Sequence, residues 1–230
     1  MPISIASEVR SYLAATVDRF APGSDEHFAR LSLQLALTAF EGGNYGIGAV
    51  AVLRKGGSLD VHFGQNKMVS GTGLVDHAET RALLHLAGTA DPDEVIPAPA
   101  NYSLASGHIA VFGTLEPCPM CASVMTNAGV TRSVSTVVDG QLVRQGEFMV
   151  SDGAANVLDE KHLIQPMVWR AIQQNRGLRF QDLASDDTQL HDLSLRVFTD
   201  TRQQIDQALA SRNPVGAYDG MREVYANRLP

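Results

Sequence analysis

The chain has 230 residues, of which 44% are hydrophobic and 19% charged, so it is long enough for one globular domain with a sizeable core. A formal net charge of −7 argues against a surface built to bind nucleic-acid backbones, which needs clustered Lys and Arg. The amino terminus lacks a basic segment followed by an apolar one, and no stretch is apolar over the thickness of a bilayer, so we expect no signal peptide, no membrane contact and a cytoplasmic location.

The first part of the chain is predicted to form two helices followed by a β-hairpin. Apolar residues recur at helical spacing up to Phe20, after which residues 21–24 break the helix and Ser24 can cap the next one. Lys55, Gly56 and Gly57 indicate a turn between two apolar runs, so the first strand pair is expected to be antiparallel. The predicted elements are helices over residues 3–20 and 25–40 and strands over 47–53 and 59–64.

The second part of the chain alternates helix and strand. Asp76 can cap a helix that His77 opens. The predicted elements are helices over 77–87, 120–127, 167–174 and 199–210, and strands over 109–112 and 132–138. Their order predicts an α/β fold, a three-layer α/β/α sandwich with a mixed central sheet. Along the chain we expect an N-terminal helix (1–24), a central domain that carries the motifs described next (25–176) and a mostly helical C-terminal extension packed on the same domain (177–230).

The most informative residues are a histidine and two cysteines in two short motifs. His77 and Glu79 form an H-x-E motif, and Cys118 and Cys121 form a P-C-x-x-C motif, which together are the signature of zinc-dependent base deaminases. The chain has two cysteines, and both lie in this motif. One imidazole and two thiolates supply the three protein ligands of a catalytic zinc, with a fourth position left for water. We therefore predict one Zn²⁺ per subunit, bound by His77, Cys118 and Cys121.

Glu79 is predicted to be the catalytic residue. It lies two residues after His77, so we expect it close to the metal but directed past it. There it can accept a proton from water and pass it to a ring nitrogen and to the departing amine. Both ligand motifs are expected at helix amino termini, whose partial positive charge favours ionised thiols.

Each half of this pattern also has a simpler interpretation. Asp76 and Glu79 fit a capping box, in which Glu79 would only bond backbone amides. Cys118 and Cys121 alone could be a redox pair or half of a structural zinc site. A structural site needs four protein ligands; a fourth histidine ligand is possible among His62, His85, His108 and His162, none of which has motif spacing. The occurrence of both motifs in the expected order favours catalysis.

The residues around these motifs resemble the cytidine deaminase-like superfamily, in particular its branch of guanine deaminases and tRNA adenosine deaminases. The sequence T-L-E-P-C-P-M-C at residues 114–121 is similar to that branch's T-L-E-P-C-x-M-C stretch. Gly48, Ala49 and Val50, and the asparagine Asn66 after Gly64 and Gln65, also resemble its hairpin. The resemblance covers about residues 25–150 and does not extend to the first helix or to residues 177–230.

The resemblance implies further roles and a choice of substrates. It implies that Asn66 hydrogen-bonds the substrate ring and that the protein is a homodimer. In the expected mechanism, backbone amides near Ala78 and Cys118 help to fix the reacting groups, so Ala78 is a second predicted substrate-binding residue. The favoured substrate is a small aminated heterocycle such as a nucleobase or nucleoside. A tRNA adenosine deaminase and a non-catalytic zinc-binding module are the alternatives; the acidic composition and the lack of a basic C-terminal helix make nucleic acid unlikely as a partner.

The loop over residues 139–152 is expected to border the substrate pocket. The strand before it is predicted to run back toward the metal, and loops at such positions often carry specificity.

Overall fold

The computed structural model describes residues 4–71, 75–88, 108–137 and 178–212. Within these ranges the helices are α1 (Ile5–Ala15), α2 (Asp25–Glu41), α3 (Ala78–Leu86), α4 (Pro119–Asn127) and α7 (Thr188–Arg212). The strands are β1 (Gly48–Lys55), β2 (Ser58–Gln65), β3 (His108–Leu115), β4 (Val130–Val137) and β5 (Arg179–Asp182). The predicted helix over 167–174 and the loop over 139–152 lie outside the described residues.

The described strands form one mixed sheet in the order β2-β1-β3-β4-β5. β1 pairs antiparallel with β2 and with β3, whereas β3 with β4 and β4 with β5 are parallel pairs. The predicted hairpin is thus confirmed. Because β3 and β4 run in the same direction, the chain must cross over between them, and α4 makes that crossover.

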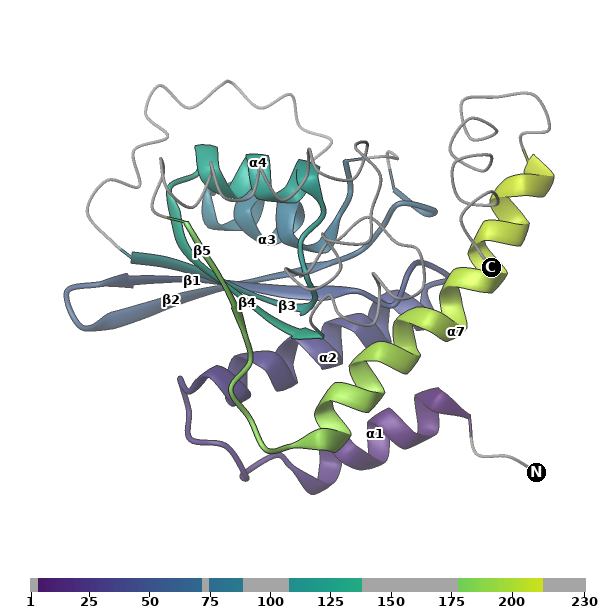
Figure 1. Ribbon diagram of the computed structural model, residues 1–230, viewed down its shortest axis with the longest axis horizontal. Helices are drawn as coiled ribbons and strands as arrows, with labels where there is room; N and C mark the ends of the chain where they lie inside the picture. The colour runs from purple at the N-terminus through teal and green to yellow at the C-terminus, as the bar shows by residue number, and fades with distance from the viewer. Residues whose placement is uncertain (1–3, 72–74, 89–107, 138–177, 213–230) are drawn as a thin grey trace, which may run out of the picture.

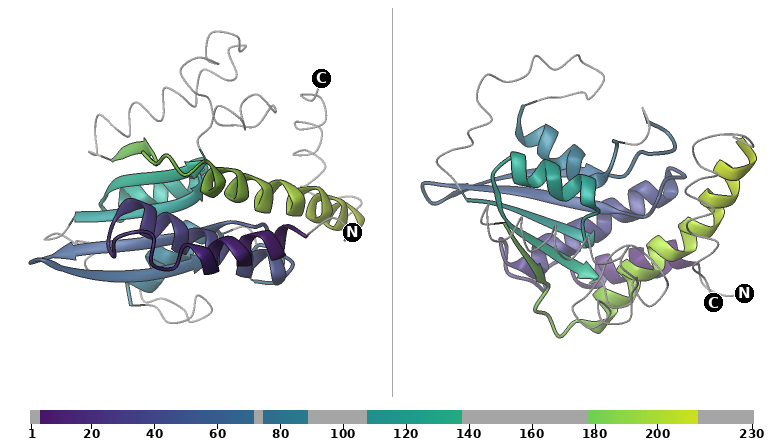
Figure 2. Two further views of the ribbon diagram at one scale, coloured as in Figure 1. Left: turned by 90° about the horizontal axis from the view of Figure 1, so that it is seen from below. Right: turned by 45° about the horizontal axis from the view of Figure 1, so that its top comes forward.

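Helices cover both faces of the sheet and bury two apolar cores (Figures 1 and 2). Helices α3 and α4 lie on one face, and α1, α2 and α7 lie on the other. The alternation of side chains along β1 divides its residues between the cores: Val50 packs in the core with α2, and Ala49 packs in the core with α3. This is the predicted three-layer α/β/α sandwich.

Two glycines let helices approach the β-hairpin closely. A Cβ atom on Gly64 of β2 would lie 2.0 Å from the carbonyl oxygen of Ala78 and 2.5 Å from the amide nitrogen of Ala82, both in α3. A Cβ on Gly48 of β1 would lie 2.1 Å from the carbonyl oxygen of Ser32 in α2. Real side chains cannot approach backbone so closely, so glycine at position 64 sets how near the first turn of α3 lies to the sheet.

Some element boundaries differ from those predicted. Ser24 caps α2 as expected, with its side chain accepting a hydrogen bond from the His27 amide. Asp76 does not cap α3: the N-cap residue is His77, and its side chain makes no capping hydrogen bond. The capping-box interpretation of Asp76 and Glu79 is therefore wrong. β3 is longer than the four predicted residues, and α7 begins eleven residues before the predicted helix.

The first and last described helices are joined by polar contacts. The Tyr12 hydroxyl donates a hydrogen bond to Asp187 Oδ2 over 2.8 Å, and Asp187 Oδ1 accepts one from the Leu190 amide at the start of α7. Arg196 of α7 pairs with Glu8 of α1. Among the described residues, none of the helices combines the length and apolar character needed to cross a membrane.

Candidate metal centre

The predicted metal ligands occupy equivalent positions in two helices. His77 is the N-cap residue of α3, and Cys118 is the N-cap residue of α4, both with extended backbone. Cys121 lies in the first turn of α4, and its amide donates a hydrogen bond to Cys118 Sγ over 3.5 Å. Because α3 and α4 lie side by side on the same face of the sheet, the two helix amino termini bring these side chains together (Figure 1).

The three ligand atoms form a compact triangle. His77 Nδ1 lies 3.5 Å from Cys118 Sγ and 3.4 Å from Cys121 Sγ, and the two sulfurs are 3.5 Å apart. In a tetrahedral zinc site with normal bond lengths, sulfur–nitrogen edges are about 3.6 Å and sulfur–sulfur edges about 3.8 Å. The donor set therefore fits zinc closely in both kind and spacing. In the part of the chain that the structure describes, no other residue joins this group of possible metal ligands.

The pKa values of the two thiols shift in opposite directions. The hydrogen bond between the sulfurs and the neighbouring His77 ring lower the pKa of the Cys118 thiol well below its usual range, against the opposing effect of burial. The same hydrogen bond and burial raise the pKa of Cys121. The two thiols thus differ in how readily they ionise, and a metal that binds both sulfurs needs both of them deprotonated.

Glu79 lies beside this triangle in a buried position. Its side chain is on the first turn of α3, with only 4% of the residue exposed, and Oε2 is 3.5 Å from Cys121 Sγ. Burial and the negative charge of Cys118 raise the pKa of the Glu79 carboxyl to about 6. A carboxyl group with a pKa near neutrality, next to the metal ligands, is suited to both accepting and donating a proton.

Asn66 and Ala78 flank the first metal ligand. The Lys67 amide donates a hydrogen bond to the Asp76 carbonyl over 2.9 Å, which draws the neighbouring residues Asn66 and His77 together. Asn66 is fully buried; its Oδ1 accepts a hydrogen bond from the Met68 amide, whereas its Nδ2 has no hydrogen-bond partner within the described residues. Ala78 is the first residue of α3 and is also fully buried.

Three supporting groups near the site were not predicted from the sequence. Asp76 forms a buried ion pair with Arg81, one turn into α3. Asn44 Oδ1 accepts hydrogen bonds from the amides of Val69 and Ser70, which shapes the loop after Asn66. Phe198 of α7 contributes to a small apolar cluster that includes Leu115, Val137 and Tyr45, at the end of β3 that leads to Cys118. These contacts join residues distant in sequence, and no local pattern marks them.

The described histidines outside the H-x-E motif have other surroundings. The ring of His62 pairs with Asp60 over 3.0 Å, and that of His85 bonds the Phe63 carbonyl over 2.7 Å. His108 begins β3, at the far end of that strand from Cys118. His162 lies in a part of the chain that the structure does not describe.

Comparisons with known proteins agree with this geometry. Residues 22–137 match the family model of the cytidine and deoxycytidylate deaminase zinc-binding region. No curated protein sequence gives a significant match. The fold is similar to that of guanine deaminase from Nitrosomonas europaea, with 16% identity over 83% of this chain and 91% of that chain and a TM-score of 0.54.

Two further solved structures are similar to the chain. NE0047 in complex with 2,6-diaminopurine has 15% identity over 83% of this chain and 88% of that chain, with a TM-score of 0.52. A structure from a study of A-to-I editing by tRNA:A34 deaminases has 20% identity over 75% of this chain and 99% of that chain, with a TM-score of 0.44. At these identities, the first of these two structures and the guanine deaminase establish a shared fold.

Proposed function

This chain belongs to the cytidine and deoxycytidylate deaminase zinc-binding family, and from that membership we propose that it is a zinc-dependent hydrolytic deaminase. The reaction replaces the amino group of a nucleobase, nucleoside or related aminated heterocycle with a carbonyl oxygen, consuming water and releasing ammonia. The observation that carries the proposal is the triangle of His77, Cys118 and Cys121 with the buried carboxylate of Glu79 beside it.

Zinc would be held by His77 Nδ1 and by the sulfurs of Cys118 and Cys121, one ion per subunit. When bound, zinc supplies the Lewis acidity that makes a water molecule nucleophilic near neutral pH. Three protein ligands leave one coordination position open, which is the arrangement of catalytic rather than structural zinc sites.

Glu79 moves the protons in this proposal. Its carboxylate accepts a proton from the attacking water and donates it to the ring nitrogen next to the reacting carbon. A second proton transfer through the same carboxylate reaches the amine, the carbon–nitrogen bond breaks, and ammonia leaves. The position of Oε2 next to the sulfur of Cys121 and the raised pKa of this carboxyl support the role.

Asn66 and Ala78 are proposed to hold the substrate ring. The Asn66 Nδ2 group is a buried donor without a partner in the described residues, and leaving such a donor unpaired costs about 1–3 kcal/mol. A ring carbonyl or ring nitrogen of the substrate would satisfy it. The Ala78 amide, at the start of α3, is free of an intrahelical partner and can donate to the same ligand.

A small aminated heterocycle is the proposed substrate class, and purines are the first to test. The similar structures include one bound to 2,6-diaminopurine. The net charge of −7 argues against a tRNA substrate. A cytoplasmic location and a homodimer also stay predictions, and the molar mass measured in solution by light scattering would test the dimer.

The decisive assay is ammonia release by the zinc-loaded protein. We expect at least one substrate from a panel of purines, pyrimidines, their nucleosides and triazines to release ammonia, with a tRNA tested in parallel. Glu79→Gln should bind zinc normally and lose about 10²-fold or more of the activity, as expected for a general acid–base residue. A zinc-loaded protein that releases ammonia from no member of the panel would leave only the non-catalytic zinc module.

A further inference from the structure

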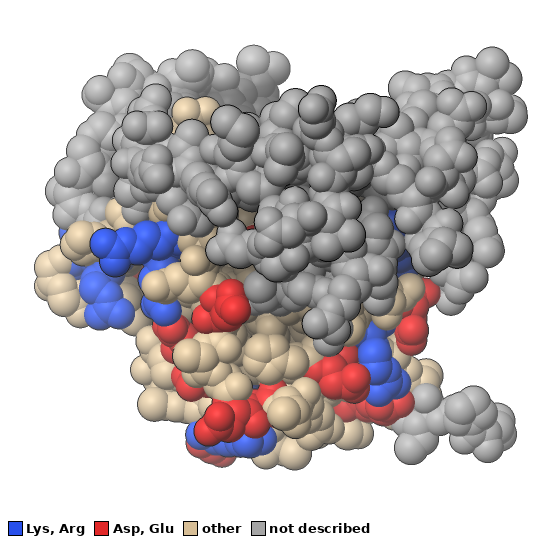
Figure 3. Space-filling view, in the orientation of Figure 1, with Lys and Arg blue, Asp and Glu red and all other residues tan. Residues whose placement is uncertain are grey.

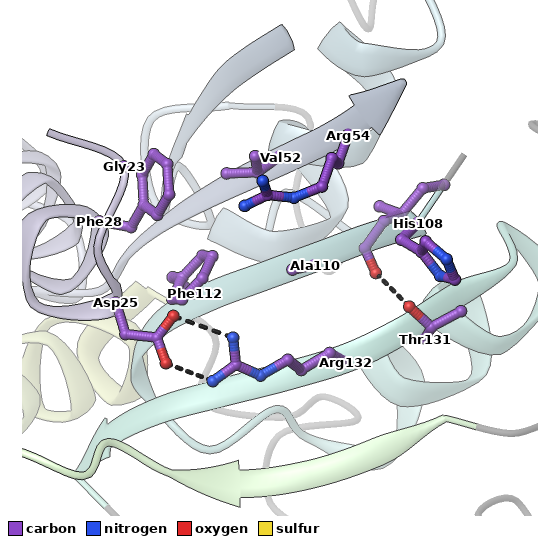
Figure 4. Close-up of a pocket in the computed structure, with 11 residues that line it drawn as sticks. Gly23, Asp25, Phe28, Val52, Arg54, His108, Ala110, Phe112, Thr131 and Arg132 are labelled. Carbon is purple, nitrogen blue, oxygen red and sulfur yellow. Dashed lines mark hydrogen bonds and ion pairs between the residues drawn. The ribbon is translucent and has the colours of Figure 1, made fainter. Parts of the chain in front are cut away.

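A hollow lies on the α2 face of the sheet, beside the first half of β3 and away from the metal ligands (Figure 4). Its volume is about 250 Å³. Its floor is lined by Val52, Phe28 and Phe112, and its rim by Arg54, His108 and Arg132. The lining residues of β3 run from His108 to Phe112, so the hollow ends three residues, or about 10 Å, before the end of β3 that leads to Cys118, and it lies on the face of the sheet opposite to α3 and α4.

The floor of this pocket is aromatic and apolar. The rings of Phe28 and Phe112 have centroids 4.8 Å apart and an angle of 35° between their planes, and both residues are buried. Val52 of β1 extends the apolar surface beside them. An apolar lining of this kind favours a small flat ring, which can bury its own apolar surface against it.

The Arg132 side chain is hydrogen-bonded within the protein. Its Nη1 lies 2.9 Å from Asp25 Oδ1, and its Nη2 bonds the second oxygen of the same carboxylate, so the pair is bidentate. The guanidinium carbon also lies 5.8 Å from the centroid of the Phe112 ring. Arg132 and Asp25 therefore form a rigid, nearly neutral wall of the pocket (Figure 4).

The Arg54 side chain has no such partner among the described residues. Arg54 lies on β1 across the pocket from Arg132 and is exposed, and its side chain makes no hydrogen bond or ion pair with any described residue. Its register partner in β3 is His108, which also lines the pocket. One wall therefore presents a free guanidinium, a group that binds carboxylates and phosphates through paired donors.

The surroundings add positive charge to this end of an acidic protein. Lys55 follows Arg54, and the exposed Arg179 of β5 is the register partner of Arg132. In Figure 3, Lys and Arg side chains gather at the end of the sheet where the β1–β2 hairpin lies. The amino terminus of the 17-residue helix α2 lies at Asp25 and contributes a partial positive charge.

We infer that this pocket binds a small organic anion in which a carboxylate or phosphate group is attached to a flat ring. The ring lies against the apolar lining formed with Val52, and the anionic group accepts hydrogen bonds from Arg54. The volume is slightly below the usual range of ligand pockets, so it fits one ring with its anionic group and nothing larger. This site is separate from the proposed deamination site in both position and ligand chemistry.

The test uses the full-length, zinc-loaded protein and two ring-bearing anions, phenyl phosphate and benzoate. Binding is followed by calorimetry and by NMR of the labelled phenylalanine rings. Inorganic phosphate and phenol supply the charge alone and the ring alone. We expect either or both ring-bearing anions to shift the Phe28 and Phe112 signals, to bind more tightly than inorganic phosphate or phenol, and to leave bound zinc in place.

Arg54→Gln and Lys55→Gln form a matched pair of variants. Both remove one positive charge at the end of β1, but alternation along the strand places the two side chains on opposite faces. Losing the charged hydrogen bonds of Arg54 should weaken binding about tenfold, whereas Lys55→Gln should change it by less than about twofold. Equal losses in the two variants, shifts confined to signals of the metal site, or no binding of either ring-bearing anion would overturn the proposal.

Discussion

Asp76 and Arg81 form a buried ion pair across the first turn of α3, with Asp76 Oδ1 2.9 Å from Arg81 Nη1. The two side chains are 3% and 9% exposed. The Asp76 carbonyl meanwhile accepts the Lys67 amide, so one residue joins the loop after Asn66 to the helix that begins at His77. The ion pair thus fixes the backbone on which the first metal ligand lies.

Arg81→Met should destabilise the protein strongly, because it leaves the Asp76 carboxylate buried without its partner. We expect a loss of about 3–5 kcal/mol in the free energy of unfolding, measured by urea titration of the zinc-loaded protein. Arg10→Met is the control: Arg10 pairs with Glu41 on the surface, where an ion pair contributes less than about 1 kcal/mol. Similar losses in the two variants would show that the Asp76–Arg81 pair has no special role.

The hydrogen bond from Tyr12 to Asp187 should make stability depend on alkaline pH. Burial and the bond to Asp187 raise the pKa of Tyr12 above its ordinary value of 10.0. Above about pH 10 the unfolded chain therefore loses the Tyr12 proton while the folded protein keeps it, and the stability that Tyr12 contributes falls as the pH rises.

Tyr12→Phe tests this dependence directly. The variant should be less stable than the native protein by about 1.5–3 kcal/mol at neutral pH, because Asp187 loses a hydrogen bond to a charged group. The difference should shrink when unfolding is measured at about pH 11. A difference that stays constant between the two pH values would contradict the account.

Gly64→Ala should weaken zinc binding, although residue 64 is not a ligand. The added Cβ would lie 2.0 Å from the Ala78 carbonyl oxygen, so the first turn of α3 must move, and His77 moves with it. We expect zinc affinity, measured by competition with a chromophoric chelator, to fall by about tenfold or more.

Gly88→Ala is the matched control at the other end of α3. Gly88 has a positive φ of 85° and no atom within 4 Å of an added Cβ. This variant should lose about 1 kcal/mol of stability through backbone strain and keep its zinc affinity. Loss of zinc in both variants would mean that general destabilisation, not the position of His77, controls metal binding.

Sequence patterns predicted the elements whose causes are local. The Ser24 cap and the hydrophobic period after it predicted α2, and the turn at Gly56 and Gly57 predicted the hairpin. The start of α7 was missed because its cap, Asp187, is held by Tyr12, which is 175 residues away. β3 was predicted too short because Gly113 and Thr114 interrupt its apolar run, although both lie in the strand and Gly113 pairs with Ala49.

In the candidate site, too, the residues in short motifs were predicted, whereas the contacts that depend on the tertiary fold were not. The spacing of His77, Glu79, Cys118 and Cys121 predicted three metal ligands with a carboxylate beside them. The structure brings these four residues together. The error at Asp76 has a physical cause: Arg81, five residues later, offers a charged partner, which is a stronger interaction than a helix cap. The supporting contacts of Asn44 and Phe198 depend on the tertiary fold and leave no local pattern.

The central claim is that one imidazole and two sulfurs hold a zinc ion that keeps an open position. The most direct measurement is X-ray absorption spectroscopy of the purified protein, combined with metal analysis. We predict one zinc per chain with two sulfur ligands at about 2.3 Å and the remaining ligands nitrogen or oxygen at about 2.0–2.1 Å. A protein that contains no zinc after purification and cannot be loaded with it, or a zinc with a different number of sulfur ligands, would contradict the account.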